Sequence, residues 1–207
     1  MTTLIYIGAN EGYSLWNIFD KYDQVYAFEP DPEMFEILNK KYKQFEWVTL
    51  INAACSTENG EANFYVTINR VSSSLSDVHS KEKSLGIPDP LKIIKVKTIN
   101  LIDFLKENNI DYIDFYLSDA QGSDLNILKT VKEYTDNKKI GELFIETHAN
   151  GIELYDGLDN QFEGFKTLLS KNYNFVHASL GSQNGKIVEE KDIPEGEKEW
   201  DSYWKLK

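Results

Sequence analysis

Short apolar runs alternate with segments of helical periodicity along the chain. Residues 4–7 and 24–28 are rich in β-branched and aromatic side chains and predict two buried strands. A helix is expected between them, at about residues 13–21. Asp31 then caps a second helix, because Pro32 suits a first helical position and Glu33 favours the positive end of the helix dipole.

The same alternation continues to the end of the chain. Strands alternating with helices predict an α/β fold, with a mainly parallel sheet wrapped by helices on both faces. Residues 187–188 and 203–206 are expected to form a terminal hairpin. The remaining strands are predicted at 47–51, 62–68, 92–99, 112–117, 143–145 and 175–178, and the remaining helices at 101–108, 122–131 and 162–169.

A long polar connection separates the strands predicted at 62–68 and 92–99. Residues 69–90 hold a run of serines together with Gly86, Pro88 and Pro90. A connection of this length inside a compact domain is typical of a functional or mobile loop. We expect it to form a lid beside an inserted β-hairpin.

Polar groups follow the first two predicted strands. Gly8 and Gly12 allow a tight turn close to a ligand, and Glu29 follows the second strand about twenty residues later. A carboxylate in this position can accept hydrogen bonds from both hydroxyls of a ribose. The glycine turn followed by Glu29 predicts a nucleoside site. Taken alone, the glycines also fit a plain strand-to-helix turn, and Glu29 also fits a surface acid.

The glycine spacing separates two cofactor classes. Dinucleotide enzymes prefer G-x-G-x-x-G, but here Ala9 and Asn10 separate Gly8 from Glu11 and Gly12. A nicotinamide-dependent oxidoreductase is therefore the weaker alternative.

Composition narrows the partners. The formal net charge of -12 would repel a nucleic-acid backbone and anionic lipid, so we expect no nucleic-acid partner. The lone Cys55 allows no intrachain disulfide and indicates a reducing compartment. No apolar run approaches the length of a bilayer span and no signal peptide is evident, which predicts no membrane insertion and a cytoplasmic location.

The length of 207 residues fits one domain. Because the first strand begins almost at once, the sequence suggests a minimal enzyme or a domain excised from a larger multidomain protein.

A series of motifs across residues 4–148 resembles the FkbM family of methyltransferases. The motifs are Gly8-Ala9-Asn10-x-Gly12, Ala27-Phe28-Glu29-Pro30-x-Pro32, Asn52-Ala53-Ala54, a hairpin after Gly60, the serines at 72–74, Leu101-x-Asp103-Phe104 and Asp119-x-Gln121-Gly122-x-Asp124.

The resemblance implies a class I, Rossmann-like methyltransferase fold with a seven-stranded sheet. It also implies S-adenosylmethionine as methyl donor and O-methylation of a sugar or glycan. By position, the methionine moiety would lie among Gly8, Asn10, Gly12, Tyr13 and Ser14, the ribose at Glu29 and Pro30, the adenine at Asn52 and Ala53, and the sulfonium near Asp119.

Two positions depart from the family pattern. Tyr6 stands where an Asp usually precedes the glycine turn, and Leu117 stands where a Lys usually precedes the Asp of the fourth main strand. The first change removes the expected contact to the donor's amino group. The second removes a cation from the catalytic strand. These departures keep open a second alternative, a non-catalytic S-adenosylmethionine-binding module.

Methyl transfer needs a base that removes the proton of the acceptor hydroxyl. Asp119 and His148 are the candidates, with Glu146 beside His148 as base or orienting group. The same three residues, Asp119, Glu146 and His148, could instead bind Mg or Mn. A further interpretation is that His148 only caps a buried strand end.

The acceptor is expected to contact mobile or late segments. Ser73, Ser74 and Gln121 are candidate contacts, and Tyr155 offers a flat face on which a pyranose could stack. At least two of the late aromatic residues, Trp200, Tyr203 and Trp204, are expected to pack in the core instead. Family resemblance suggests a deoxyhexose such as rhamnose or fucose, and a glycosyltransferase as a fused or cooperating partner.

Overall fold

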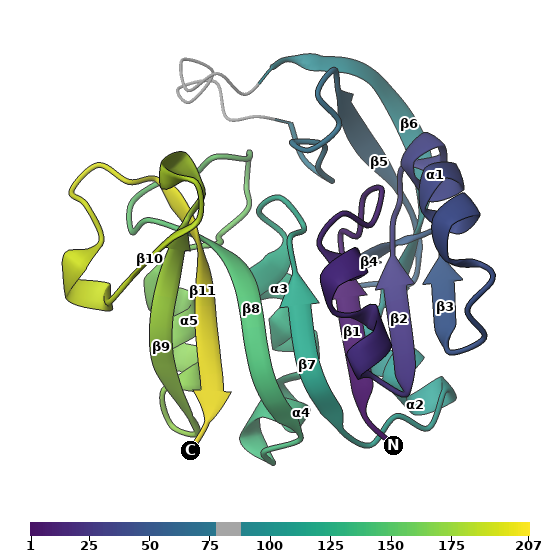
Figure 1. Cartoon of the computed structure of the whole chain (residues 1–207). Helices are drawn as coiled ribbons and strands as arrows, with labels where there is room; N and C mark the ends of the chain where they lie inside the picture. Colours follow the sequence, from purple (N-terminus) through teal and green to yellow (C-terminus); the bar gives the residue numbers. More distant parts are fainter. Residues whose placement is uncertain (78–87) are drawn as a thin grey trace.

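A computed structural model of the protein describes residues 1–77 and 88–207. Its strands form two sheets, one of eight strands in the order β10-β9-β11-β8-β7-β1-β2-β3 and one of three in the order β4-β6-β5 (Figure 1). The strands are β1 (Thr3–Ile7), β2 (Gln24–Phe28), β3 (Val48–Ile51), β4 (Ala54–Ser56), β5 (Gly60–Thr67), β6 (Pro90–Asn100), β7 (Ile113–Ser118), β8 (Ile140–His148), β9 (Tyr173–Leu180), β10 (Lys186–Val188) and β11 (Glu199–Leu206).

Helices cover both faces of the large sheet. They are α1 (Pro32–Tyr42), α2 (Leu101–Glu107), α3 (Asp124–Thr130), α4 (Lys132–Asp136) and α5 (Phe162–Leu169). In Figure 1, α2, α3 and α5 lie behind the sheet. Across the described residues, no helix has the length and apolar character needed to cross a membrane.

The large sheet is mixed. Strands β3, β2, β1, β7 and β8 run parallel, whereas β11 pairs antiparallel with both β8 and β9, and β10 pairs antiparallel with β9. The predicted α/β architecture is confirmed, but the expectation of a mostly parallel seven-stranded sheet is wrong. Short β10 adds an eighth strand at one edge, and it does so by a tight return from β9.

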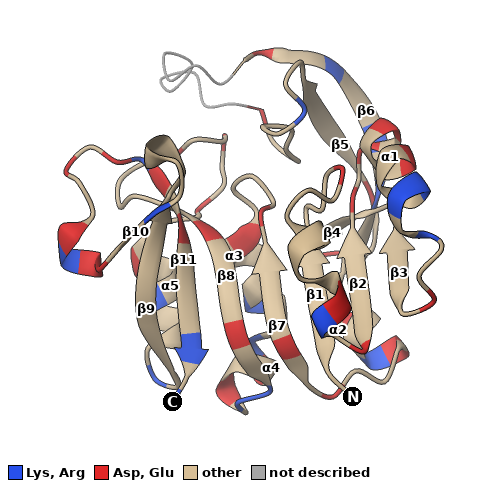
Figure 2. Cartoon of the chain, viewed as in Figure 1, with Lys and Arg blue, Asp and Glu red and all other residues tan. Residues whose placement is uncertain are grey.

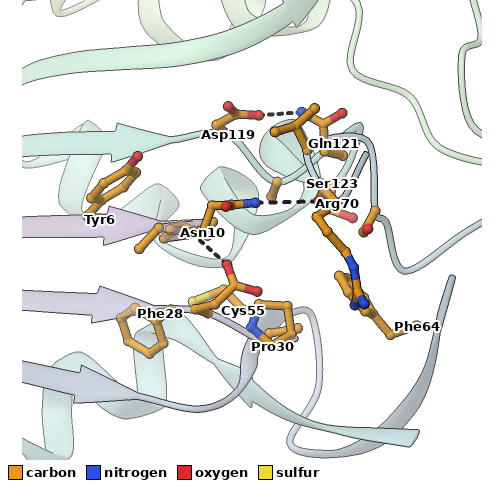
Figure 3. Close-up of a pocket in the computed structure, with 18 of the residues that line it drawn as sticks. Tyr6, Asn10, Phe28, Pro30, Cys55, Phe64, Arg70, Asp119, Gln121 and Ser123 are labelled. Atoms are coloured by element: carbon orange, nitrogen blue, oxygen red, sulfur yellow. Dashed lines mark hydrogen bonds between the residues drawn. The ribbon is translucent and has the colours of Figure 1, made fainter. Parts of the chain in front are cut away.

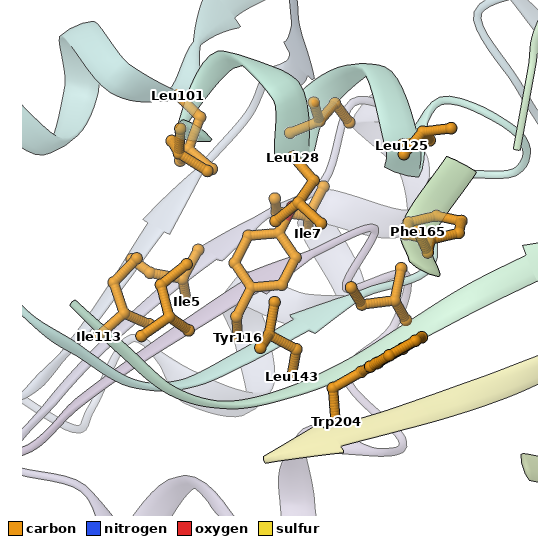
Figure 4. Packing of buried hydrophobic residues seen from close by; sticks show 14 of the residues in the cluster. Ile5, Ile7, Leu101, Ile113, Tyr116, Leu125, Leu128, Leu143, Phe165 and Trp204 are labelled. Atoms are coloured by element: carbon orange, nitrogen blue, oxygen red, sulfur yellow. The ribbon is translucent and has the colours of Figure 1, made fainter. Parts of the chain in front are cut away.

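All five residues of β1 are buried. From Leu4 to Ile7, successive side chains alternate between two different cores. Ile5 and Ile7 pack in the larger core with Tyr116 of β7 and the apolar faces of α2, α3 and α5 (Figure 4). Leu4 and Tyr6 point to the other face, where α1 packs. Burial on both faces explains why this strand reads as a continuous apolar run.

The segment predicted as a helix at residues 13–21 is instead two 3₁₀ turns, at Leu15–Asn17 and Phe19–Lys21. Aromatic, β-branched and polar residues with weak helix propensity fill this stretch. Leu15 and Phe19 are nevertheless buried in the second core, so packing fixes the path of the chain without a regular helix.

The predicted terminal hairpin is also wrong. Strand β10 folds back on β9 through a turn in which Asn184 and Gly185 both have positive φ. Strand β11 is inserted between β8 and β9, where it is paired on both edges. Trp200 and Trp204 pack in the larger core, as expected for at least two of the late aromatic residues.

The expected inserted hairpin is present as β5 and β6, which pair antiparallel. Strand β4 was not predicted and pairs parallel with β6, which makes a small separate sheet beside the carboxyl end of β2. The central part of the expected lid, residues 78–87, lies outside the described residues.

Trp204→Ala is expected to lower the free energy of unfolding by about 3–5 kcal/mol, because the indole is 1% exposed and packs in the larger core. Trp16→Ala is the matched control, since Trp16 is 60% exposed and its loss should cost less than about 1 kcal/mol. Urea denaturation of the two variants measures the difference. Equal losses would contradict the insertion of β11 between β8 and β9.

Candidate functional site

A cavity of about 360 Å³ opens at the carboxyl ends of β1, β2 and β7, where ligands bind in open α/β sheets (Figure 3). The small sheet forms its opposite wall. The residues that line it include Tyr6, Gly8, Asn10, Tyr13, Ser14, Glu29, Pro30, Ala53, Cys55, Phe64, Arg70, Ser73, Asp119 and Gln121.

The turn after β1 brings the backbone close to the cavity. Gly8 and Gly12 have φ values of 74° and 77°, which side-chain-bearing residues rarely adopt. The amides of Gly8 and Ala9 both donate to the carbonyl of Phe28, at 3.1 and 2.9 Å. A Cβ on Gly8 would lie 2.0 Å from the carbonyl oxygen of Asp119. Glycine is therefore required for the ends of β1 and β7 to approach each other.

Glu29 is buried at the end of β2. Its two carboxylate oxygens accept hydrogen bonds from the backbone amides of Asn10 and Asp31, each at 2.7 Å. Burial raises the pKa of Glu29 to about 7, although both hydrogen bonds act in the opposite direction. The carboxylate is thus fixed in orientation and keeps lone pairs for further donors on the cavity side.

The two residues predicted to border the adenine, Asn52 and Ala53, differ in whether they line the cavity. Asn52 does not line the cavity, because its side-chain amide donates to the carbonyls of Glu29, at 2.8 Å, and Pro30, at 3.3 Å. Ala53 does line it, and so do Cys55 and the apolar residues Phe28, Ala54, Phe64, Val71 and Leu75. Asn52 thus holds the β2 turn in shape, while an apolar wall faces the cavity.

Arg70 borders the cavity and was not found from the sequence. Its guanidinium donates to Asp31 and to Glu33, both at 2.7 Å, and its carbonyl accepts a hydrogen bond from the Asn10 side chain at 3.4 Å. These contacts tie the loop after β5 to the start of α1. Only a long-range pairing joins these segments, so no local pattern indicates Arg70.

Tyr6, the first departure from the family pattern, lines the cavity. Burial raises the pKa of its phenol, while Ser14 acts in the opposite direction. Tyr13 also borders the cavity but is 82% exposed. Leu117, the second departure, does not line the cavity and packs in the second core.

Gln121 connects four of the predicted site residues. Its side-chain nitrogen donates to Asp119 and, at 2.8 Å, to Glu146, while its side-chain oxygen accepts from the Tyr155 hydroxyl at 2.6 Å. Its carbonyl accepts from Ser74 Oγ at 2.7 Å. Gln121 has a φ of 50°, so a strained backbone aims this side chain.

The predicted acceptor residues differ in position. Ser73 and Gln121 line the cavity, but Ser74 and Tyr155 are buried and do not. Tyr155 packs against Gly122, where a Cβ would come within 2.8 Å of its ring. The expectation that a pyranose stacks on Tyr155 is therefore wrong, and this residue supports Gln121 from behind.

Asp119 faces the cavity at the end of β7. Its side chain is exposed at the cavity, but the surrounding protein and the nearby charges of Asp124 and Asp201 raise its pKa to about 7. A carboxyl group with this pKa can both accept and release a proton near neutral pH.

His148 is completely buried and does not line the cavity. Burial lowers its pKa to about 4, so the imidazole is neutral at physiological pH. Of the two candidate bases, only Asp119 borders the cavity.

The expected metal-ligand set is only partly assembled. Glu146 and His148 lie together, but within the described residues the acidic side chain that completes the cluster is Glu199 of β11 and not Asp119. Strand pairing explains the difference, because Glu199 lies opposite His148 in the antiparallel register of β11 and β8.

Solved structures with similar folds were compared with the chain. The FkbM methyltransferase from Methylobacillus flagellatus KT is 13% identical with a TM-score of 0.55, and the match covers 98% of this chain and 43% of that protein. An rRNA methylase from Streptococcus thermophilus is 9% identical with a TM-score of 0.52, over 99% of this chain and 87% of that protein. These matches show a class I methyltransferase-like α/β fold.

The comparison with curated proteins gave no match. The family model of the methyltransferase FkbM domain matches residues 7–176, which include both the glycine turn and the β7–β8 side of the cavity. The chain therefore belongs to the FkbM family of methyltransferases.

Proposed function

We propose that the chain transfers a methyl group from S-adenosylmethionine to a hydroxyl of a sugar or glycan. The observation that carries this proposal is the placement of Glu29 and Asp119 around one cavity, on either side of the glycine turn. A deoxyhexose such as rhamnose or fucose is the proposed acceptor class. A glycosyltransferase that supplies the acceptor, a cytoplasmic location and a single-domain enzyme remain predictions.

The cavity fits the donor chemically. The Glu29 carboxylate would accept hydrogen bonds from the ribose hydroxyls, and the apolar wall near Ala53 and Phe64 suits a flat adenine ring. The glycine turn leaves room for the methionine moiety at Gly8. With Tyr6 in place of the usual Asp, the Asn10 and Asp119 side chains, which both line the cavity, are proposed to hold the amino group.

Bound S-adenosylmethionine would supply an electrophilic methyl group on its sulfonium. The chain's own task is to hold the acceptor oxygen in line with that group and to remove its proton as the C–O bond forms and the C–S bond breaks. In this proposal Asp119 takes the proton, since it borders the cavity and its pKa of about 7 suits a base. Gln121 orients Asp119 through a hydrogen bond.

Electrostatics favour a neutral acceptor over RNA. The carboxylates that raise the pKa of Asp119 include Asp124, Asp201 and Glu199. Figure 2 shows acidic residues where β8 ends and β11 begins. A phosphate backbone would be repelled there, whereas a sugar hydroxyl can donate to carboxylates. A donor-binding module without turnover is the alternative, and it would bind donor without methylating any acceptor.

Glu29→Ala is expected to weaken binding of S-adenosylhomocysteine about 10- to 100-fold, because two charge-assisted hydrogen bonds to the ribose are lost. Isothermal titration calorimetry measures this effect, with micromolar affinity expected for the unaltered protein and none for NAD. Glu36→Ala, at an exposed position of α1, is the control. Unchanged affinity in the Glu29 variant would refute the ribose assignment.

Binding of S-adenosylhomocysteine is also expected to strengthen with pH. The raised pKa of Glu29, about 7, means that below neutral pH the carboxyl is protonated and one acceptor for the ribose is lost. Affinity should therefore rise by up to about tenfold per pH unit from pH 6 and level off above pH 8. Glu29→Gln should remove this dependence and Asp119→Asn should retain it; the opposite pattern would assign the titration to Asp119.

Asp119→Asn is expected to lower kcat for methyl transfer about 10²- to 10⁴-fold while changing affinity for S-adenosylhomocysteine only a few-fold. The reason is that the amide cannot accept the hydroxyl proton. Turnover of rhamnosides and fucosides, assayed by S-adenosylhomocysteine release, provides the measurement. In the unaltered enzyme the rate should rise with pH through about 7, where Asp119 ionises. An unaffected rate in the variant would exclude Asp119 as the base.

A further inference from the structure

We propose that Glu146, His148 and Glu199 bind a divalent first-row transition-metal ion, of the Mn²⁺ or Zn²⁺ type, at the edge where β8 and β11 meet. One ligand atom of each residue lies within 4.8 Å of the others. The site is separate from the donor cavity, which neither His148 nor Glu199 lines. It therefore goes beyond the proposed methyl transfer.

The imidazole of His148 is buried without hydrogen-bond partners among the described residues, which favours a bound ligand. The ring is 0% exposed, and neither ring nitrogen has a hydrogen-bond partner in the described part of the chain. A buried polar atom left without a hydrogen-bond partner destabilises the fold unless another ligand satisfies it. Nε2 lies 4.0 Å from Glu146 Oε2, too far for a hydrogen bond but close enough for both atoms to bind one ion. A neutral imidazole is also the form that binds metals.

The geometry needs little adjustment. Metal–ligand distances of about 2.0–2.2 Å allow two ligands of one ion to be about 4 Å apart. Glu146 is fixed by hydrogen bonds from Gln121 and the Gly122 amide, and His148 is held inside the sheet. Glu199 is exposed at the start of β11, so its flexible side chain can close the remaining distance.

The surrounding charge favours a cation. Glu146 shares the side-chain nitrogen of Gln121 with Asp119, and Glu199 lies within 4.8 Å of the same group, so three carboxyl groups gather here. A divalent ion would compensate several of these carboxylates at once.

The ligand set also limits the ion. One imidazole and two carboxylates favour Mn²⁺, Fe²⁺, Co²⁺ or Zn²⁺ over Ca²⁺, which prefers oxygen ligands alone. Three protein ligands with an exposed Glu199 leave coordination positions open to solvent, as in sites that bind water or a substrate oxygen. Gln121 connects Glu146 to the cavity, so the ion would lie beside the acceptor side of the proposed active site.

The test is a titration of the chelator-treated 207-residue chain with Co²⁺, without donor or acceptor. Co²⁺ is the probe because its visible absorption reports nitrogen and carboxylate ligation directly. We expect one ion per chain, displaced by Zn²⁺ but not by Ca²⁺. Glu199→Gln and His148→Ala should each weaken binding at least about tenfold. Glu195→Gln is the matched control, since it removes the same charge from an exposed position on the same segment.

The outcomes are decisive in either direction. No absorption change, or equal affinity in Glu199→Gln, His148→Ala and Glu195→Gln, would overturn the site, because the ion would then bind elsewhere or not at all. Binding of S-adenosylhomocysteine is measured in parallel on the same variants. Loss of Co²⁺ binding with retained S-adenosylhomocysteine affinity supports the metal site independently of the proposed function. Loss of both through misfolding is identified by circular dichroism. In that case the surface variant Glu199→Gln decides whether the metal site exists.

Discussion

The close approach of β1 and β7 at Gly8 is the contact on which the site depends. The Asp119 amide donates to the Ile7 carbonyl at 3.1 Å, and the Asp119 carbonyl occupies the space where a side chain at Gly8 would lie. Parallel strands deliver their carboxyl ends to one edge of the sheet, but only this contact sets the groups that follow β1 and β7 around a single cavity. Glu29 joins them because the Gly8 and Ala9 amides both bond to the Phe28 carbonyl.

A second constraint acts on the β7–β8 side, where Gln121 holds two carboxyl groups with one amide nitrogen. An amide does not titrate, so it can keep donating to Asp119 whether that group is ionised or protonated, on its remaining lone pairs. Asp124 fixes the turn before it by accepting from the Ala120 amide and from Ser118. The strained backbone of Gln121 is thus stabilised by buried hydrogen bonds on both sides.

How far the sequence predicted this arrangement follows from the range of each interaction. Gly8, Glu29 and Asp119 could be found because each follows a buried apolar strand, and strand ends converge by rule. The helix predicted at residues 13–21 is wrong because residues of weak helix propensity fill this segment, and the packing of Leu15 and Phe19 fixes its path without a regular helix. Arg70 and Glu199 could not be found, since each reaches the site through pairing with a segment distant in sequence. The predicted terminal hairpin gave no reason to place Glu199 near the site, because it is the pairing of β11 with β8 that puts Glu199 opposite His148.

The acidic, partly unsatisfied cluster at β8 and β11 is costly for folding. Apolar side chains at Glu146 and His148 would remove an unpaired imidazole and a desolvated carboxyl from the interior, and such replacements of buried polar groups often stabilise proteins. The cores on the two faces of the sheet supply ample burial to tolerate that cost. Buried polar groups without partners inside a well-packed fold tend to mark functional positions. Here Gln121 connects this cluster to the proposed base, because its side chain donates to both Glu146 and Asp119. The electrostatic cost and the proposed methyl transfer therefore lie at the same end of the sheet. A cation bound there would lower the electrostatic cost and leave the cavity open to donor and acceptor.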